Sequence, residues 1–251
     1  MSYAREVINV STTDGVGLIE LDRPERRNAL DVATCRELAD ATGRVRDEGA
    51  RAVVVTGSGT SFCSGADFGE VYTDGFREAL YAALHAVADL PMPVVAAVNG
   101  PAIGAGTQLA IACDLRVAAP SAVFALPTAR LGLAVDPWTI GRLVQVGGGG
   151  SARSLLLACA QMDASTAYAR GLVDAPGERA DALALAADMA TMAPLTLAYN
   201  KTAVNAFGQG AEPSTGEIDL DEEFERCWSS ADLQEGRVAR TEKRAPRFTG
   251  Q

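Results

Sequence analysis

The sequence predicts an α/β fold, because short β-branched apolar runs alternate with segments whose apolar residues recur at helical spacing. Two of these runs, residues 52–56 and 94–98, are each followed by a glycine-rich turn that opens a helical pattern. Beyond residue 151 the strand signals fade and helical patterns take over. We therefore predict an α/β core followed by a mainly helical C-terminal part.

The N-terminal half supplies the strands and the first helices. Residues 7–10 and 16–21 flank Asp14-Gly15, a pair typical of tight turns, and so predict a β-hairpin. Apolar residues spaced three or four apart mark the helices, and runs of Val and Ala mark the buried strands. The further elements predicted in this half are helices at residues 31–47, 76–90 and 108–113, and strands at 53–56, 94–98, 115–118 and 123–126.

The C-terminal half is predicted to be mainly helical. The expected helices cover residues 151–161, 164–170, 180–192, 195–207, 218–228 and 231–242, with a loop at 208–216. The glycine run 147–150 lacks the Lys-Ser/Thr of a phosphate-binding loop and is interpreted as a connector. A helical tail rich in apolar residues is expected to pack on a neighbour. We therefore divide the chain at Pro194 into a core of residues 1–193 and an oligomerisation region of residues 194–251.

The composition narrows the possible functions. A net charge of −10 argues against a protein that binds the phosphate backbone of nucleic acids. No apolar run approaches the ~20 residues of a membrane span. The N-terminal residues lack the apolar core of a signal peptide, so we expect a cytoplasmic location. The five scattered cysteines and one histidine form no metal-binding pattern, and we expect no metal site.

Two glycine-rich turns carry the functional signal. Residues 57–67 (GSGTSFCSGAD) and 99–110 (NGPAIGAGTQLA) each follow a strand pattern and open a helical one. Small residues at such a turn let a ligand approach the main chain closely, and a helix start leaves its first N–H groups without acceptors. Two such turns side by side would direct two N–H donors at one carbonyl oxygen, which is an oxyanion hole.

Five segments, in the right order and spacing, resemble the crotonase (enoyl-CoA hydratase/isomerase) superfamily, and the similarity covers nearly the whole chain. They are residues 21–30, 62–67, 99–114, 164–174 and 242–248. Within the family the chain looks closest to actinobacterial members whose catalytic glutamates are replaced. The resemblance implies a spiral of ββα turns and a C-terminal helical trimerisation region that gives a homotrimer or a dimer of trimers. It also implies an acyl-CoA or enoyl-CoA ligand, with coenzyme A as part of the substrate and no separate cofactor.

The resemblance further implies which groups hold the thioester carbonyl. The oxyanion donors would be the backbone N–H groups of Ala66 and Ala105. Ala105 replaces a glycine that is usual in the family. The donor is kept if the φ angle of Ala105 is negative, since the substitution adds only a methyl group.

The resemblance also implies where coenzyme A binds. The loop and the turn expected to contact it contain Arg23, Arg26, Arg27 and Ala29, and Ser64, Ala66, Asp67 and Phe68. Arg26 or Arg27 would pair with phosphates, and Lys243 or Arg244 from the C-terminal tail would reach the 3′-phosphate. The alternative interpretation of these cations is solvated surface charge.

The chain departs from the family at the acid–base positions. Hydration of an enoyl thioester needs one carboxylate to activate water and another to deliver a proton. The two glutamates of family hydratases correspond here to Gln108 and Thr128. Gln exchanges no proton near neutral pH and Thr is a far weaker acid than a carboxylic acid. The expectation is therefore thioester binding with ordinary hydratase activity weak or lost.

One carboxylate, Asp136, remains close in sequence to these positions. It matches an aspartate that moves protons in dienoyl-CoA isomerases of the family, and it is a candidate catalytic base. The alternative is that Asp136 caps a helix or pairs with Arg142.

Three aromatic side chains complete the predicted substrate pocket, together with Gln108 and Thr128. Tyr81 and His85 lie one turn apart on the predicted helix 76–90, and Trp138 follows Asp136. The alternative for His85 is a half-buried structural role, and the alternative for Trp138 is a place in the core.

Three functions remain open at this stage. The chain binds acyl-CoA without turning it over, isomerises an enoyl-CoA with Asp136 as its one base, or is a weak hydratase with water held by Gln108. The first is a binding protein of fatty-acid metabolism. The other two are enzymes, an isomerase and a lyase.

Overall fold

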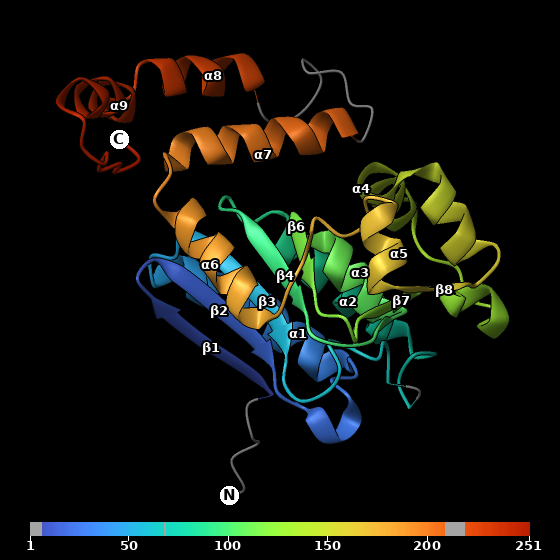
Figure 1. The fold of residues 1–251 in the computed structure, drawn as a ribbon. Helices are drawn as coiled ribbons and strands as arrows, with labels where there is room; N and C mark the ends of the chain where they lie inside the picture. The colour runs from blue at the N-terminus through green and yellow to red at the C-terminus, as the bar shows by residue number, and fades with distance from the viewer. Residues whose placement is uncertain (1–6, 68, 209–218) are drawn as a thin grey trace, which may run out of the picture.

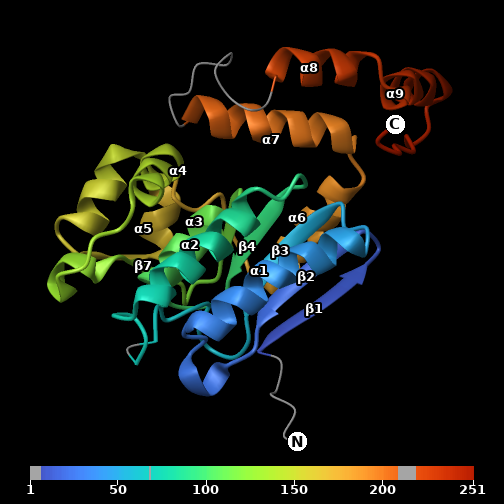
Figure 2. The same cartoon turned by 180° about the vertical axis from the view of Figure 1, so that it is seen from behind.

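The computed structural model describes residues 7–67, 69–208 and 219–251, and its centre is a six-stranded sheet (Figures 1 and 2). The strand order is β1-β2-β3-β4-β6-β9, and all neighbours are parallel except β1 and β2. A smaller sheet has the order β5-β7-β8. The strands are β1 (Ile8–Thr13), β2 (Val16–Leu21), β3 (Ala52–Gly57), β4 (Val94–Val98), β5 (Ala102–Ile103), β6 (Leu115–Ala118), β7 (Val123–Ala125), β8 (Gln161–Asp163) and β9 (Ala175–Pro176).

Helices cover both faces of the larger sheet, with α1, α2 and α3 on one face and α6 on the other (Figures 1 and 2). Successive side chains of β3 alternate between these faces. Val53 and Val55 pack with α1, α2 and α3, whereas Ala52 and Val54 pack against α6. The helices are α1 (Val32–Asp47), α2 (Asp74–Ala88), α3 (Ala105–Ala112), α4 (Pro137–Leu156), α5 (Ala164–Ala169), α6 (Arg179–Ala190), α7 (Pro194–Gly208), α8 (Leu220–Trp228) and α9 (Ala231–Glu242), with 3₁₀ turns η1 (Pro24–Arg26) and η2 (Pro127–Leu131).

Local sequence signals fix the ends of several elements. Asp14 and Gly15 have φ angles of 50° and 77°, and they close the β1–β2 turn, so the predicted hairpin is confirmed. Asp31 caps α1 by accepting a hydrogen bond from the Thr34 N–H (2.8 Å). Asp163 caps α5 in the same way. Polar capping residues therefore define the first residue of these helices, whereas the apolar pattern alone gives it only approximately.

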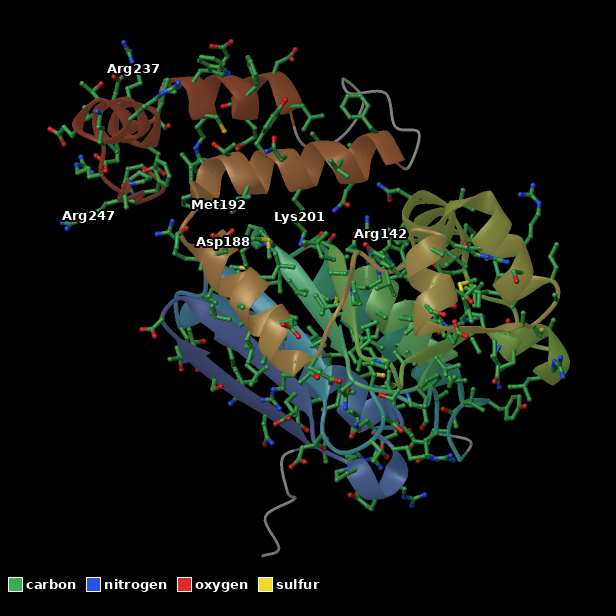
Figure 3. All side chains as sticks on the ribbon, in the orientation of Figure 1. Arg142, Asp188, Met192, Lys201, Arg237 and Arg247 are labelled. Carbon is green, nitrogen blue, oxygen red and sulfur yellow. The ribbon has the colours of Figure 1, made fainter. Side chains whose placement is uncertain are left out.

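The C-terminal helices α7, α8 and α9 lie outside the α/β core (Figures 1 and 2). Helix α7 begins at Pro194, at the predicted boundary. Lys201 extends from α7 toward the core (Figure 3), where its ammonium group pairs with Asp114 (2.8 Å). Arg142 of α4 donates to the Asn205 side chain of α7 (2.9 Å). These polar contacts tie α7 to the core.

The structure differs from the sequence prediction in three respects. The predicted connector 147–150 lies inside α4, which bends at Gly148 (φ 74°, ψ 159°) and ends at Leu156. The strands β5, β8 and β9 were not predicted, because two or three residues are too few to show a periodic pattern. Helix α8 begins at Leu220, and residues 209–218 of the predicted loop and helix lie outside the described residues.

Within the described ranges, no single helix is both long and apolar enough to cross a membrane. Helices α6 and α7 meet this test of length and composition only when they are taken together. That pair is bent by 113°.

Candidate functional site

The two glycine-rich turns lie against each other and exchange backbone hydrogen bonds. The Cys63 N–H donates to the Pro101 carbonyl (3.1 Å), and the Ile103 N–H donates to the Cys63 carbonyl (3.0 Å). A Cβ atom added at Gly65 would lie 2.7 Å from the Ile103 oxygen, and one at Gly106 would lie 2.1 Å from the Cys63 oxygen. Both distances are too short for any side chain, so glycine is required for the turns to meet.

Two backbone donors at this junction have no acceptor. Across the part of the chain that the structure describes, neither the Ala66 nor the Ala105 N–H forms a hydrogen bond. The turns are close enough that a Cβ on Gly65 would lie 3.7 Å from the Ala105 nitrogen. Gly104 (φ 56°) precedes α3 and offers no side-chain cap, which leaves the Ala105 N–H free.

The φ angle of Ala105 has the negative sign that its N–H needs in order to act as an oxyanion donor. Ala105 is the first residue of α3 and is absent from the residues with positive φ, so its φ is negative and its N–H keeps the orientation of a helix start. The positive end of the α3 dipole adds to the potential at this point. This geometry can stabilise a carbonyl oxygen, or negative charge that develops on it.

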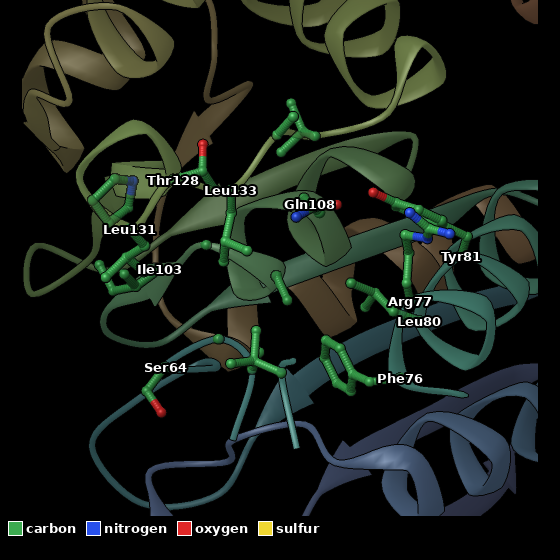
Figure 4. A pocket seen from close by; sticks show the side chains of 18 residues that line it. Ser64, Phe76, Arg77, Leu80, Tyr81, Ile103, Gln108, Thr128, Leu131 and Leu133 are labelled. Carbon is green, nitrogen blue, oxygen red and sulfur yellow. The ribbon is translucent and has the colours of Figure 1, made fainter. Parts of the chain in front are cut away.

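A cavity of about 170 Å³ opens in front of these donors (Figure 4). Most of the side chains around it are aliphatic or aromatic, as in a site for an apolar group. Its walls come from both glycine turns, α2, η2 and the segment before α4. The residues that line it are Ser64, Gly65, Ala66, Val71, Phe76, Arg77, Leu80, Tyr81, Ile103, Gly104, Ala105, Gln108, Pro127, Thr128, Leu131, Leu133, Ala134 and Val135.

Gln108 and Thr128, which the sequence analysis assigned to a substrate pocket, both line the cavity. Gln108 is 5% exposed, and its Oε1 accepts a hydrogen bond from the Thr139 hydroxyl (3.3 Å). The described lining includes no Asp or Glu. The groups that face a bound acyl chain therefore offer hydrogen bonds but no carboxylate for proton transfer.

Asp136 caps α4, as one of the two interpretations of the sequence expected. Its Oδ2 accepts hydrogen bonds from the Trp138 N–H (3.1 Å) and the Thr139 N–H (3.3 Å). Its Oδ1 is buried and has no partner among the described residues. Asp136 is absent from the cavity lining, although the adjacent Val135 is present. It does not pair with Arg142, which donates to the Ile111 carbonyl (2.9 Å).

The three predicted aromatic residues occupy different places. Tyr81 lines the cavity, and burial followed by the charge of Asp136 raises the pKa of its hydroxyl above the ordinary value. His85 and Trp138 are not among the lining residues. Their rings contact each other instead, with centroids 4.6 Å apart and planes at 52°.

The Asn28 side chain holds the loop predicted to bind coenzyme A against the first glycine turn. This side chain is 1% exposed and donates to the carbonyls of Ser58 (2.9 Å) and Ser61 (2.8 Å). Arg27 and Asn28 both adopt positive φ (51° and 56°), and the Ser64 N–H donates to the Arg27 carbonyl (3.0 Å). The loop and the first glycine turn therefore form one continuous surface beside the cavity.

Arg23 and Ala29 hold this loop together rather than face outward. The Arg23 guanidinium donates to Asp31 (2.7 Å) and to the carbonyl of the buried Ala29 (2.9 Å). Burial by itself would raise the pKa of Asp31, but hydrogen bonds from Thr34 and the Arg23 charge hold that pKa below its ordinary value. Arg23 is thus already paired with a carboxylate.

The other predicted contacts to coenzyme A are dispersed. Arg26 and Arg27 are exposed, and their guanidinium groups have no partner within the described residues. Asp67 lies beside the loop, since its N–H donates to the Leu30 carbonyl (2.7 Å), and Phe68 lies outside the described residues. Lys243 is the C-cap of α9, and in space α9 lies on the opposite side of the molecule from η1 (Figures 1 and 2).

Other chemistries find no support at this site. Cys63 is buried in the first turn, and burial raises the pKa of its thiol to about 12, so it stays protonated and is no nucleophile. Among the described residues, no group of three or more His, Cys, Asp or Glu side chains is placed to hold a metal ion.

Several residues that line the cavity belong to no motif in the sequence. Phe76, Arg77 and Leu80 of α2 face it together with Tyr81, and Ile103 and Leu133 close its far side (Figure 4). The i, i+4 spacing of residues 76 and 80, and of 77 and 81, is the signal that would have found them, because such residues share one helix face.

Comparison with known proteins identifies the family. The family model for enoyl-CoA hydratase/isomerase matches residues 11–251. The chain is 44% identical to a "Probable enoyl-CoA hydratase echA6" of Mycobacterium bovis, over 97% of this chain and 100% of that protein. It is 35% identical to a "1,2-epoxyphenylacetyl-CoA isomerase" of Escherichia coli, over 94% and 95%. It superposes with a TM-score of 0.89 on an "enoyl-CoA hydratase/carnithine racemase" of Magnetospirillum magneticum, at 31% identity and covering 99% and 97%. The chain therefore belongs to the enoyl-CoA hydratase/isomerase family and has the crotonase fold.

Proposed function

We propose that this protein binds acyl-CoA thioesters through an oxyanion hole made by the Ala66 and Ala105 N–H groups. One observation carries the proposal: two backbone donors without acceptors lie at the same mainly apolar cavity. A thioester carbonyl satisfies both donors at once, and its acyl chain fills the apolar space behind them. Family membership supports this choice of ligand.

We propose that coenzyme A lies against the loop of residues 23–29 and the Ser64 turn. The exposed, unpaired guanidinium groups of Arg26 and Arg27 support contacts with its phosphates. Arg23 is held by Asp31 and contributes by shaping the loop. Because α9 and η1 lie at opposite ends of one chain (Figure 1), contact between Lys243 and a 3′-phosphate needs a second copy.

Ordinary hydration is proposed to be slow. Gln108 and Thr128 stand at the two positions where the family resemblance expects acid–base glutamates, and both line the cavity. Loss of each general acid or base costs about 10²–10⁴ in rate. The oxyanion hole alone leaves some rate above that in water. We therefore favour a thioester-binding protein of fatty-acid metabolism with weak or absent hydratase activity.

The two enzymatic alternatives have less support. A one-base isomerase needs the Asp136 carboxylate at the substrate, whereas Oδ2 is engaged with the start of α4 and the residue is outside the cavity lining. A hydratase with water held by Gln108 would have a hydrogen-bonding amide at the cavity but no carboxylate in the described lining to take up or deliver a proton.

A homotrimer or a dimer of trimers remains our proposal for the assembly. Apolar side chains stay exposed along α4, α7 and α8, and their burial would favour association. They include Ile140 (41%), Val144 (45%), Val204 (60%), Phe207 (61%) and Trp228 (61%).

Calorimetry with hexanoyl-CoA, pentanoyl-CoA and free coenzyme A tests the proposed function. The folded protein should bind the thioesters more tightly than free coenzyme A, because only the thioesters reach the oxyanion donors and the apolar cavity. Absence of binding by every thioester, with the fold confirmed by circular dichroism, would overturn the proposal.

A further inference from the structure

Arg77 is an unusual side chain for the lining of an acyl cavity. Of the described residues that line the cavity, it alone carries a charge. It belongs to α2, together with the lining residues Phe76, Leu80 and Tyr81. Within the described residues its guanidinium has neither an ion pair nor a hydrogen bond. Arg77 is exposed, so its guanidinium lies at the solvent side of the cavity, where a plain fatty-acyl chain would offer it nothing to bind.

Tyr81 places a second donor beside Arg77. The two residues are separated by one helical turn, so they share a face of α2, and the Arg77 charge acts on the Tyr81 hydroxyl. Figure 4 shows both side chains on one side of the cavity, across from Ile103 and Leu131, with the Tyr81 hydroxyl directed toward Gln108. Burial and the charge of Asp136 raise the pKa of Tyr81, so its phenol stays protonated and able to donate.

We propose that Arg77 and Tyr81 select acyl-CoA ligands whose acyl chain carries a second, free carboxylate. This inference rests on the proposed function, because the oxyanion hole must fix the thioester end. The guanidinium would then bind the distal carboxylate while the Tyr81 hydroxyl donates to one of its oxygens. The aliphatic side chains of Leu80, Leu133 and Val135 would cover the methylene groups between.

The chemistry of the lining favours a carboxylate over other polar groups. A planar guanidinium donates two parallel hydrogen bonds to a carboxylate, which makes such pairs stronger than neutral hydrogen bonds. The described lining itself holds no Asp or Glu, and the carboxylate whose charge acts on Tyr81, Asp136, lies outside it with Oδ2 engaged at the start of α4. The cavity of about 170 Å³ has room for a short dicarboxylic chain.

Paired ligands of equal chain length test the inference by calorimetry. Glutaryl-CoA is compared with pentanoyl-CoA, and adipyl-CoA with hexanoyl-CoA, for the wild type and for the variants Arg77→Met, Tyr81→Phe and Arg130→Met. Arg130 lies on η2, whose neighbouring residues line the cavity, but is not itself in the lining. Arg130→Met therefore controls for loss of positive charge near the cavity mouth.

The wild type should bind the dicarboxylic member of at least one pair about fivefold more tightly, since an ion pair made by an exposed guanidinium is partly screened by solvent. Arg77→Met should abolish this preference while retaining binding of the apolar member. Tyr81→Phe should reduce the preference, and Arg130→Met should leave it unchanged.

Equal binding within both pairs would overturn the inference and leave the proposed function intact, since Arg77 would then only cover apolar surface with its stem. A preference that survives in Arg77→Met, or disappears equally in Arg130→Met, would also overturn it. Failure of every thioester to bind the folded protein would overturn the proposed function and the inference together.

Discussion

Replacing Ala105 by proline removes one oxyanion donor with little other change. Ala105 is the first residue of α3, the helical position that proline tolerates best, because its missing N–H has no intrahelical acceptor. The Ala105 N–H has no acceptor in the described structure, so no internal hydrogen bond is lost. The adjacent Gly104 keeps its own bond to the Ala125 carbonyl (2.8 Å). We expect the free energy of unfolding to change by no more than about 1 kcal/mol.

The effect on binding follows from the loss of one donor to the thioester oxygen. A buried acceptor left without one partner costs about 1–2 kcal/mol, which corresponds to about 5- to 30-fold in Kd. The proline Cδ takes the position of the lost hydrogen and adds to this loss by crowding the carbonyl. Affinity for free coenzyme A should stay the same, since its proposed contacts, on the loop of residues 23–29 and the Ser64 turn, do not include the Ala105 N–H.

Calorimetry with hexanoyl-CoA and coenzyme A measures both affinities, and thermal unfolding monitors the fold. The matched control is Ala105→Gly, which keeps the N–H and should bind hexanoyl-CoA within about threefold of the wild type. If Ala105→Pro binds hexanoyl-CoA as tightly as the wild type does, the Ala105 N–H is not a thioester donor. Equal losses for hexanoyl-CoA and coenzyme A would instead show general distortion of the turn.

Three further predictions concern the loop, the chemistry and the assembly. Asn28→Ala should lower the free energy of unfolding by about 2–4 kcal/mol, because it leaves two buried carbonyls unpaired and places Ala at φ 56°. Denaturant titration measures this loss, with the surface variant Arg36→Ala as the control. A loss smaller than that of Arg36→Ala would contradict the prediction. Gln108→Glu with Thr128→Glu should raise crotonyl-CoA hydration by at least about 10² over a slow wild type, whereas an ordinary enzymatic rate in the wild type would show that our interpretation of the site is wrong. Sedimentation at micromolar concentration should give a trimer or hexamer, and a monomer would refute the proposed assembly.

The elements that could be predicted from the sequence are those in which the spacing of apolar residues repeats over several helical turns or along a whole strand. The hairpin, α1, β3, α2 and β4 are long enough to show it, and the structure confirms them. The strands β5, β8 and β9 are two or three residues long, and only tertiary pairing defines them. A helix cap at Asp136 was one of two interpretations of the sequence, but the extent of α4 was not predicted, because the glycine run 147–150 was interpreted as a connector and lies inside this helix.

The candidate site was predictable where backbone geometry determines it. The glycine-rich turns were recognised as places where the main chain is open to close approach, and in the structure Gly65 and Gly106 are where the two turns approach each other. The residues that line the cavity were harder to predict from the sequence, because side chains from α2, η2 and the segment before α4 meet only after the chain has folded. His85 and Trp138 show the difficulty: both have suitable chemistry for a pocket, but they contact each other outside its lining. Arg77 shows the converse, since only the structure places this cation at the cavity.

Isotope-edited infrared spectroscopy of a bound thioester tests the central proposal most directly. Hexanoyl-CoA labelled with ¹³C at its thioester carbonyl reports the hydrogen bonds to that oxygen through its stretching frequency. Two donors, Ala66 and Ala105, should lower the frequency in the bound ligand relative to the free one, and Ala105→Pro should recover part of the difference. A bound carbonyl whose frequency equals that in water or lies above it, in both proteins, would contradict an oxyanion hole at this site.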